Sequence, residues 1–265
     1  MAILTHGSDL TLAPTIRPLT QAVGGSPRRA FTSVAERGFH AVQLDATMPG
    51  LRPRDLDKSA RRDLAAALRR AGLAVSGVDF FIPADHYVDP AQTDRAVGSL
   101  HAALALAADL GRVAVSLNLP AIEAEPQIVS GLLAAADGLG SRLALHHEHD
   151  PGALLDWMKG QDDRLVGAGL DPAALLAARR DPVAEAQAFG DRLVVARLSD
   201  ARRGMADGTR SIVGKGDLDL MSYRVSVDLA PRRTGPVVLD LRSLADPLVA
   251  AERALAAWDG AAMKM

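Results

Sequence analysis

The chain has 265 residues, with 30 Lys and Arg against 32 Asp and Glu, and no Cys. This length suits one domain as large as an α/β barrel, and the lack of Cys excludes disulfides, thiol nucleophiles and cysteine-based metal centres. The formal net charge of −2 gives no general attraction to nucleic acid or to an anionic membrane. We see no signal peptide and no apolar segment near the ~20 residues that span a bilayer. We therefore expect a soluble cytoplasmic protein whose partner is a small polar molecule.

Short apolar, β-branched runs alternate with longer stretches of helical period. The predicted strands are Leu10–Ile16, Ala41–Asp45, Ala74–Phe80, Val113–Leu117, Arg142–His146, Leu165–Leu170, Leu193–Leu198 and Pro236–Leu241. The predicted helices are Pro27–Arg37, Leu56–Ala71, Pro90–Leu110, Pro126–Leu139, Gly152–Lys159, Pro172–Gly190 with a break near Arg180, Leu218–Leu229 and Pro247–Trp258. Eight strand–helix units in a chain of this length predict that residues 1–265 form a single (β/α)8 TIM barrel.

Helix starts have a recurrent signature, in which Ser or Asp directly precedes Pro. The pairs are Ser26-Pro27, Asp89-Pro90, Asp150-Pro151, Asp171-Pro172, Asp181-Pro182 and Asp246-Pro247. The first residue of each pair can cap a helix, and Pro is tolerated at the first helical position because its missing N–H would be unpaired there. We expect a helix to begin at each pair.

Polar side chains end most of the predicted strands. They include Asp45, Asp79, Asn118, His146, Asp171, Arg197, Asp240 and Arg242. The functional face of a TIM barrel is formed by the carboxyl ends of its strands, so these residues are expected around one mouth. Acids, a histidine and arginines in one place fit chemistry on a small polar substrate, with or without a metal ion.

The strongest cluster of titratable residues is the segment LALHHEHD, residues 143–150. Alternation along a strand puts His146 and Glu148 on one face, where they can move protons or hold a divalent cation. The alternative is that one ring lies in the barrel wall while the other side chains cap the following loop.

Two more candidates have a structural as well as a functional interpretation. Asp171 is a metal ligand or an acid/base group, or else an ordinary helix cap before Pro172. Arg197 either grips an anion at the mouth or forms a buried ion pair that holds the wall together. Asp240 and Arg242 share one strand face, so both are expected near the mouth.

Other candidates would bind substrate. Asp45, Asp79 and Asn118 could contact hydroxyl groups, although the two acids could instead pair with arginines. His86 lies in a long loop that could cover the site. Lys215 lies between two glycines that could let the backbone approach an anion, but we favour a purely structural role for this segment.

Four stretches resemble the xylose isomerase-like barrels, the sugar phosphate isomerase/epimerase superfamily. They are GFHAVQLD, LALHHEHD, GAGLDP and ARLSDA followed by GKGDLD, and the resemblance runs from about Phe31 to Trp258. It implies one divalent cation (manganese or magnesium, with zinc or cobalt as further options) held by Glu, Asp, His and Glu on the last four strands. It also implies an acid/base pair that acts on a ketose through an enediolate, and it favours a homo-oligomer.

Carried over by position, the family's ligand set is altered in this chain. The sixth-strand Asp is Asp171, whereas the fifth-strand Glu falls on His146, with Glu148 nearby, and the eighth-strand Glu falls on Asp240. The seventh-strand His falls on Arg197, which has no acceptor lone pair and cannot ligate a metal. A rewired site of His146, Glu148, Asp171 and Asp240 could hold a cation, and a site without any metal is the alternative.

Three functions follow from the resemblance. The first is an isomerase or epimerase for a sugar or sugar phosphate, with Asp171, Asp240, Arg197 and His146 as catalytic residues. The second is a non-catalytic carbohydrate-binding or accessory barrel that has lost the metal site. The third, an abasic-site endonuclease, is disfavoured because it needs several zinc ligands and a cationic surface.

Overall fold

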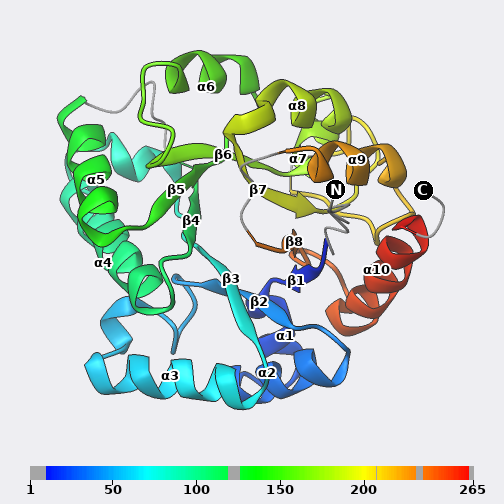
Figure 1. Cartoon of the computed structure of the whole chain (residues 1–265), viewed down its shortest axis with the longest axis horizontal. Helices are drawn as coiled ribbons and strands as arrows, with labels where there is room; N and C mark the ends of the chain where they lie inside the picture. Colours follow the sequence, from blue (N-terminus) through cyan, green and yellow to red (C-terminus); the bar gives the residue numbers. More distant parts are fainter. Residues whose placement is uncertain (1–9, 119–125, 207, 231–234, 263–265) are drawn as a thin grey trace, which may run out of the picture.

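Eight parallel strands form one sheet that is nearly closed into a barrel, and helices surround it (Figure 1). The computed structural model describes residues 10–118, 126–206, 208–230 and 235–262. The strands are β1 (Leu12–Pro14), β2 (Ala41–Asp45), β3 (Ala74–Asp79), β4 (Ala114–Leu117), β5 (Arg142–Leu145), β6 (Val166–Leu170), β7 (Leu193–Leu198) and β8 (Val237–Leu239). Their order is β1-β8-β7-β6-β5-β4-β3-β2, and an isolated bridge between Thr15 and Gln43 links β1 to β2. The predicted (β/α)8 TIM barrel is confirmed.

The helices follow the predicted alternation, with one addition. They are α1 (Ile16–Ala22), α2 (Pro27–Glu36), α3 (Lys58–Arg70), α4 (Thr93–Asp109), α5 (Pro126–Leu139), α6 (Pro151–Met158), α7 (Pro172–Ala177), α8 (Pro182–Phe189), α9 (Leu220–Asp228) and α10 (Pro247–Ala262). Helix α1 was not expected, because its residues continue the apolar run of the first strand. No helix among the described residues combines the length and apolar character that a membrane crossing requires.

The capping signature predicts most of the helix starts correctly. Side chains of Ser26, Asp150, Asp171, Asp181 and Asp246 accept hydrogen bonds from backbone N–H groups in the first turns of α2, α6, α7, α8 and α10. The predicted break near Arg180 is confirmed, since α7 ends at Ala177 and α8 begins at Pro182. Asp89-Pro90 is the exception: Asp89 accepts from the N–H of Ala91, but α4 begins only at Thr93.

Glycines make room for long polar side chains at two places on the barrel strands. A Cβ on Gly77 of β3 would lie 2.8 Å from Oε1 of Gln43, and a Cβ on Gly169 of β6 would lie 2.0 Å from Nε2 of His146. Both distances are far below van der Waals contact, so a larger residue would displace the polar side chain. These two glycines therefore fix where Gln43 and His146 can lie.

Candidate active site

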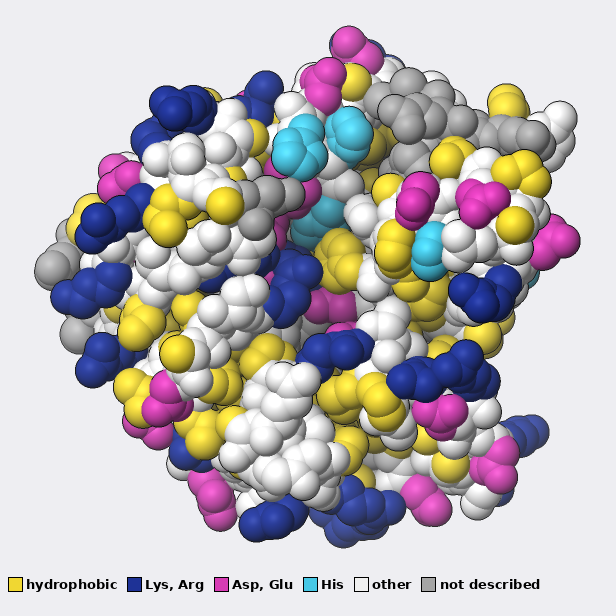
Figure 2. Space-filling view, turned by 180° about the vertical axis from the view of Figure 1, so that it is seen from behind, with side chains coloured by type: hydrophobic (Ala, Val, Ile, Leu, Met, Phe, Trp, Pro, Cys, Tyr) yellow, Lys and Arg dark blue, Asp and Glu magenta, His cyan; other side chains and the backbone are white. Residues whose placement is uncertain are grey.

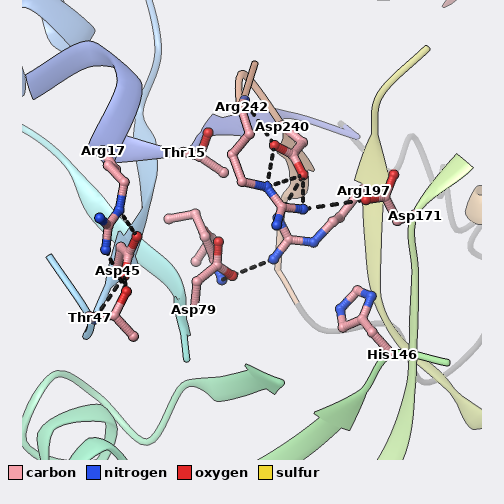
Figure 3. Close-up of polar contacts among 12 residues, drawn as sticks. Thr15, Arg17, Asp45, Thr47, Asp79, His146, Asp171, Arg197, Asp240 and Arg242 are labelled. Carbon is pink, nitrogen blue, oxygen red and sulfur yellow. Dashed lines mark hydrogen bonds and ion pairs between the residues drawn. The ribbon is translucent and has the colours of Figure 1, made fainter. Parts of the chain in front are cut away.

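A buried ion-pair network occupies the carboxyl ends of β3, β7 and β8 (Figure 3). Arg197 of β7 is fully buried, and its Nη2 donates to Oδ1 of Asp79 at the end of β3. Its Nη1 donates to Oδ2 of Asp240, directly after β8, at 3.2 Å. The structure thus confirms that Asp79, Arg197 and Asp240 meet, and it favours the buried-pair interpretation of Arg197.

A second layer of arginines covers this pair from the solvent side. Arg242 places Nε 2.9 Å and 3.0 Å from the two carboxylate oxygens of Asp240, and its Nη2 lies 3.3 Å from Oδ2 of Asp171. Nη2 of Arg210 donates to Oδ2 of Asp171 and, at 3.0 Å, to Oδ2 of Asp240. We call Asp79, Asp171, Arg197, Arg210, Asp240 and Arg242 the Arg–Asp cluster. Three guanidinium groups in it face three carboxylates, so its formal charges cancel.

The guanidinium groups control the protonation of the buried carboxylates. Burial alone would raise the pKa of Asp240, but Arg242, Arg210 and Arg197 outweigh it and hold that pKa well below its usual value. Burial likewise opposes ionisation of Asp171, and so does the charge of Asp240, yet Arg210, Arg242 and the Ser199 hydroxyl lower its pKa. Both carboxylates are therefore ionised and weakly basic near neutral pH.

The predicted helix-cap role of Asp171 is confirmed, and its role as a metal ligand or acid/base group stays a prediction. Its Oδ1 accepts from the N–H of Ala173 at 3.1 Å, which caps α7, and from the Ser199 hydroxyl at 2.6 Å. Its Oδ2 accepts from the arginines of the cluster. One carboxylate therefore anchors a helix start and the charge network at once.

His146 and Glu148 form a separate pair at the end of β5. Nδ1 of His146 lies 2.8 Å from Oε1 of Glu148, and His146 is buried. The predicted placement of both residues on one side is confirmed. In the neutral form of the imidazole, a carboxylate acceptor at Nδ1 places the ring proton on Nδ1 and leaves the lone pair on Nε2.

Phe81 connects the pair to the arginines. Its ring meets the His146 ring edge-on, with centroids 5.3 Å apart. The guanidinium carbons of Arg197 and Arg242 each lie 5.0 Å from the centre of the same ring. Phe81 therefore contacts both the His146–Glu148 pair and the Arg–Asp cluster, and stabilises the cations through its ring face.

Some of the buried polar atoms without a partner lie on β4 or directly after β4 and β5, and others, such as Nε of Arg197 and Arg210, belong to the Arg–Asp cluster. Among the described residues the first set includes Oγ of Ser116, Oδ1 of Asn118 and Nε2 of His146. Buried polar atoms are nearly always hydrogen-bonded, so such a group marks a place where a polar molecule can bind. The face in Figure 2 is hollowed near its centre, and cationic, acidic and histidine side chains meet there.

Several predicted substrate-binding residues lie outside this network. Asp45 pairs with Arg17 of α1 and accepts from the Thr47 hydroxyl at 2.7 Å. His86 lies in a short 3-10 helix of the β3–α4 loop, and Lys215 is exposed in the loop before α9. The structure places none of these three in contact with the Arg–Asp cluster among the described residues.

The glycine-rich loop before α9 binds a side chain of this chain. Backbone N–H groups of Gly214, Gly216 and Leu218 donate to the buried carboxylate of Asp200 at 2.9–3.1 Å. A Cβ on Gly216 would lie 2.1 Å from that carboxylate, which explains the glycine. The structural role that we favoured for this segment agrees with these contacts.

Three residues of the site were not predicted from the sequence: Arg210, Arg17 and Phe81. Arg210 comes from an irregular loop with no periodicity, and only the folded loop brings it to Asp171. Arg17 lies on the unexpected helix α1. Phe81 directly follows Asp79 and Phe80, and its position after a strand end was the available signal.

The donor set does not fit a divalent cation. The described residues include no group of three or more His, Asp and Glu side chains placed to hold a metal. Oδ2 of Asp171 and Oδ2 of Asp240 already accept from arginines, and a cation between them would face three guanidinium charges. The metal site of His146, Glu148, Asp171 and Asp240 stays a prediction that this arrangement disfavours.

Known proteins share this architecture. The family model of the xylose isomerase-like TIM barrel matches residues 31–256. A xylose isomerase domain protein from Planctomyces limnophilus is 18% identical, with a TM-score of 0.77 over 96% of this chain and 98% of that one. A D-tagatose 3-epimerase-like protein is 15% identical, with a TM-score of 0.73 over 96% and 99%.

A third solved structure is a xylose isomerase-like TIM barrel protein from Mycobacterium smegmatis in complex with magnesium. It is 16% identical, with a TM-score of 0.69 over 96% of this chain and 98% of that one. No curated protein matches the sequence. At these identities the structural likeness establishes the fold, and the chemistry has to be argued from the residues of this chain.

Proposed function

The chain belongs to the xylose isomerase-like TIM barrel family, and on this premise we propose that it is an isomerase-type enzyme for a sugar or sugar phosphate. Arginine takes the electrophilic role in it, and His146 moves the proton. The observation that carries this proposal is the contact of His146 Nδ1 with Glu148, which leaves Nε2 of the neutral imidazole as the proton acceptor. The ring of Phe81 lies between this imidazole and the guanidinium groups of Arg197 and Arg242, and contacts all three.

The proposed step is proton abstraction beside a carbonyl group. Nε2 of His146 takes the proton, the C–H electron pair forms a carbon–carbon double bond, and the carbonyl π electrons move to oxygen. The resulting enediolate accepts hydrogen bonds from the guanidinium group of Arg242, which carries a fixed positive charge. The hydroxyl proton on the adjacent carbon passes to the former carbonyl oxygen, and the imidazolium returns its proton to the former carbonyl carbon. The new carbonyl group then lies on the adjacent carbon, which completes an aldose–ketose isomerisation.

Asp171 and Asp240 act as positioning residues in this scheme. Their lowered pKa values make them weak bases near neutral pH, and each accepts from two or more groups of the protein. They hold Arg210 and Arg242 in place. One base supports isomerisation better than epimerisation, because epimerisation needs a proton donor on the opposite face of the substrate.

Access to Nε2 requires a side-chain movement. The atom is buried, whereas the side chain of Arg242 is 36% exposed and Phe81 is partly exposed. Nε2 lies against Gly169 of β6, where an added Cβ would come within 2.0 Å of it, so the imidazole ring has to turn away from β6 before a substrate can reach it. Burial in this position keeps bulk water from the base until a substrate is bound.

The test is proton exchange with solvent. Chelator-treated protein is incubated in D2O with aldose–ketose pairs and their phosphates, and deuterium incorporation and interconversion are followed by NMR. We expect both with at least one substrate, and a loss of about a hundredfold or more in His146→Gln. His101→Gln, an exposed change on α4, is the matched control and should retain the rate. Activity that survives in His146→Gln overturns the proposal.

A non-catalytic binding barrel is the second candidate. The observation that favours it is the charge balance of the Arg–Asp cluster, which needs no ligand to be neutral. Saturable sugar binding without any exchange would support this function over the first.

A further inference from the structure

A hollow lies beside the Arg–Asp cluster, between α1 and the loop after β8. Its volume is about 380 Å³, within the roughly 300–1,000 Å³ typical of small-molecule sites. Its polar lining consists of Arg17, Gln21, Arg242 and Ser243, and apolar side chains such as Leu244 complete it. In TIM barrels the loops after the last two strands frequently bind phosphate, so this position suits an anion.

The two arginines of the hollow are more exposed than the carboxylates that they pair with. The side chain of Arg17 is 34% exposed and that of its partner Asp45 is 17% exposed. The contrast is larger for Arg242, at 36%, and Asp240, at 0%. An approaching solute therefore meets positive charge first, although the formal charges of each pair cancel.

Each arginine also keeps one nitrogen for a ligand. Arg17 uses Nε on Asp45 and Nη2 on Thr47, and Arg242 uses Nε and Nη2 on Asp240 and Asp171 (Figure 3). None of the hydrogen bonds among the described residues uses Nη1 of either one. The NH2 group at Nη1 of each arginine is therefore available to a ligand, and the ion pairs at the other two nitrogens hold the guanidinium plane in a fixed orientation.

We propose that this hollow is an oxyanion subsite, in which Arg17 and Arg242 bind the phosphate or carboxylate group of an anionic sugar derivative. The inference rests on the proposed function and restricts its substrates to anionic sugar derivatives, because a neutral sugar has no charged group to bind in the subsite.

The first experiment measures binding alone, by calorimetric titration of inorganic phosphate into the full chain at low ionic strength. We expect saturable binding that weakens about tenfold or more in Arg17→Gln and less in Arg17→Lys, which keeps the charge. Arg62→Gln, an equal change of charge on the exposed face of α3, is the control and should bind as the wild type does. Absence of binding, or equal affinity in Arg17→Gln, overturns the subsite.

The second experiment separates this inference from the proposed function. Exchange in D2O is compared for a neutral ketose, its terminal phosphate and the related keto sugar acid. A kcat/KM at least tenfold higher for either anion supports the subsite, and the preferred anion identifies the oxyanion. Equal exchange on all three overturns the subsite and leaves the isomerase proposal standing. Phosphate binding that depends on Arg17, without exchange on any sugar, overturns the isomerase proposal alone.

Discussion

The two halves of the barrel mouth differ in how their buried polar groups are paired. At β6 to β8, every carboxylate of the Arg–Asp cluster accepts from a guanidinium group, and Asp240 accepts from three arginines, while Nε of Arg197 and Nε of Arg210 have no partner among the described residues. At β4 and β5, buried atoms of Ser116, Asn118 and His146 have no partner among the described residues. The first half is a preformed electrostatic scaffold, whereas the second retains hydrogen-bonding capacity for a ligand. A catalytic mouth needs both, because a fixed field stabilises charge while an unpaired acceptor moves a proton.

The largest expected effect comes from breaking the scaffold at Asp240. Asp240→Asn removes the carboxylate that Arg197, Arg210 and Arg242 share, and leaves the fully buried Arg197 with Asp79 alone. We expect the free energy of unfolding to fall by about 3–5 kcal/mol, as for other broken buried pairs. Urea unfolding measures it, and Asp63→Asn on the exposed face of α3 should change it by less than about 0.5 kcal/mol. A similar small loss in Asp240→Asn would contradict the shared network.

Arg197→His tests whether the guanidinium group of Arg197 prevents a divalent cation from binding beside Asp240. The change removes a cation and introduces an imidazole lone pair beside Asp240. We expect Mn2+ at a hundredfold excess over its Kd to raise the free energy of unfolding of the variant by about 2.7 kcal/mol, and to leave the wild type unchanged. Thermal unfolding with and without Mn2+ measures this. The exposed variant Arg62→His should respond like the wild type, and stabilisation of the wild type would show that the arginines do not exclude a cation.

Gly169→Ala perturbs the half of the mouth that keeps the unpaired acceptor. The new Cβ would lie 2.0 Å from Nε2 of His146, so the imidazole has to move. We expect a cost of about 1–3 kcal/mol in unfolding free energy and a loss of at least tenfold in proton exchange. Gly138→Ala in α5 meets no atom within 4 Å and should stabilise the chain by up to about 1 kcal/mol. Normal exchange in Gly169→Ala would argue against His146 as the base.

The smallest expected effect is the acid dependence of stability. Asp171 and Asp240 have lowered pKa values in the folded chain, so between those values and the unfolded pKa of about 3.9 the unfolded chain binds more protons. Their contribution is full above the unfolded pKa and is lost as pH falls through the folded values. Urea unfolding at pH 7, 5, 4 and 3 should show a plateau and then a decline that is shallower in Asp240→Asn. An identical decline in both proteins would contradict this assignment.

The sequence by itself determined the barrel and most of the mouth. Strand–helix alternation and Asp–Pro caps are local signals, and they located all eight strands and the break between α7 and α8. The polar residues that end strands identified Asp79, His146, Asp171, Arg197 and Asp240, because position after a strand is itself local. The two-residue period of a strand predicted His146 and Glu148 on one side, but β5 ends at Leu145, so the contact between them is made by the segment after the strand.

Only the tertiary structure decided how these residues are paired. Arg197 meets Asp79 across 118 positions of sequence, and Arg210 reaches Asp171 from an irregular loop held by Asp200. Neither contact leaves a periodic trace, since the partners come from separate strands and loops. The lowered pKa of Asp240 depends on burial and on long-range charge, and the hollow that both Arg17 and Arg242 line forms only when α1 and the loop after β8 come together. The local sequence determines which residue types follow each strand. The electrostatic field of these residues arises only when the barrel brings the carboxyl ends of the strands together.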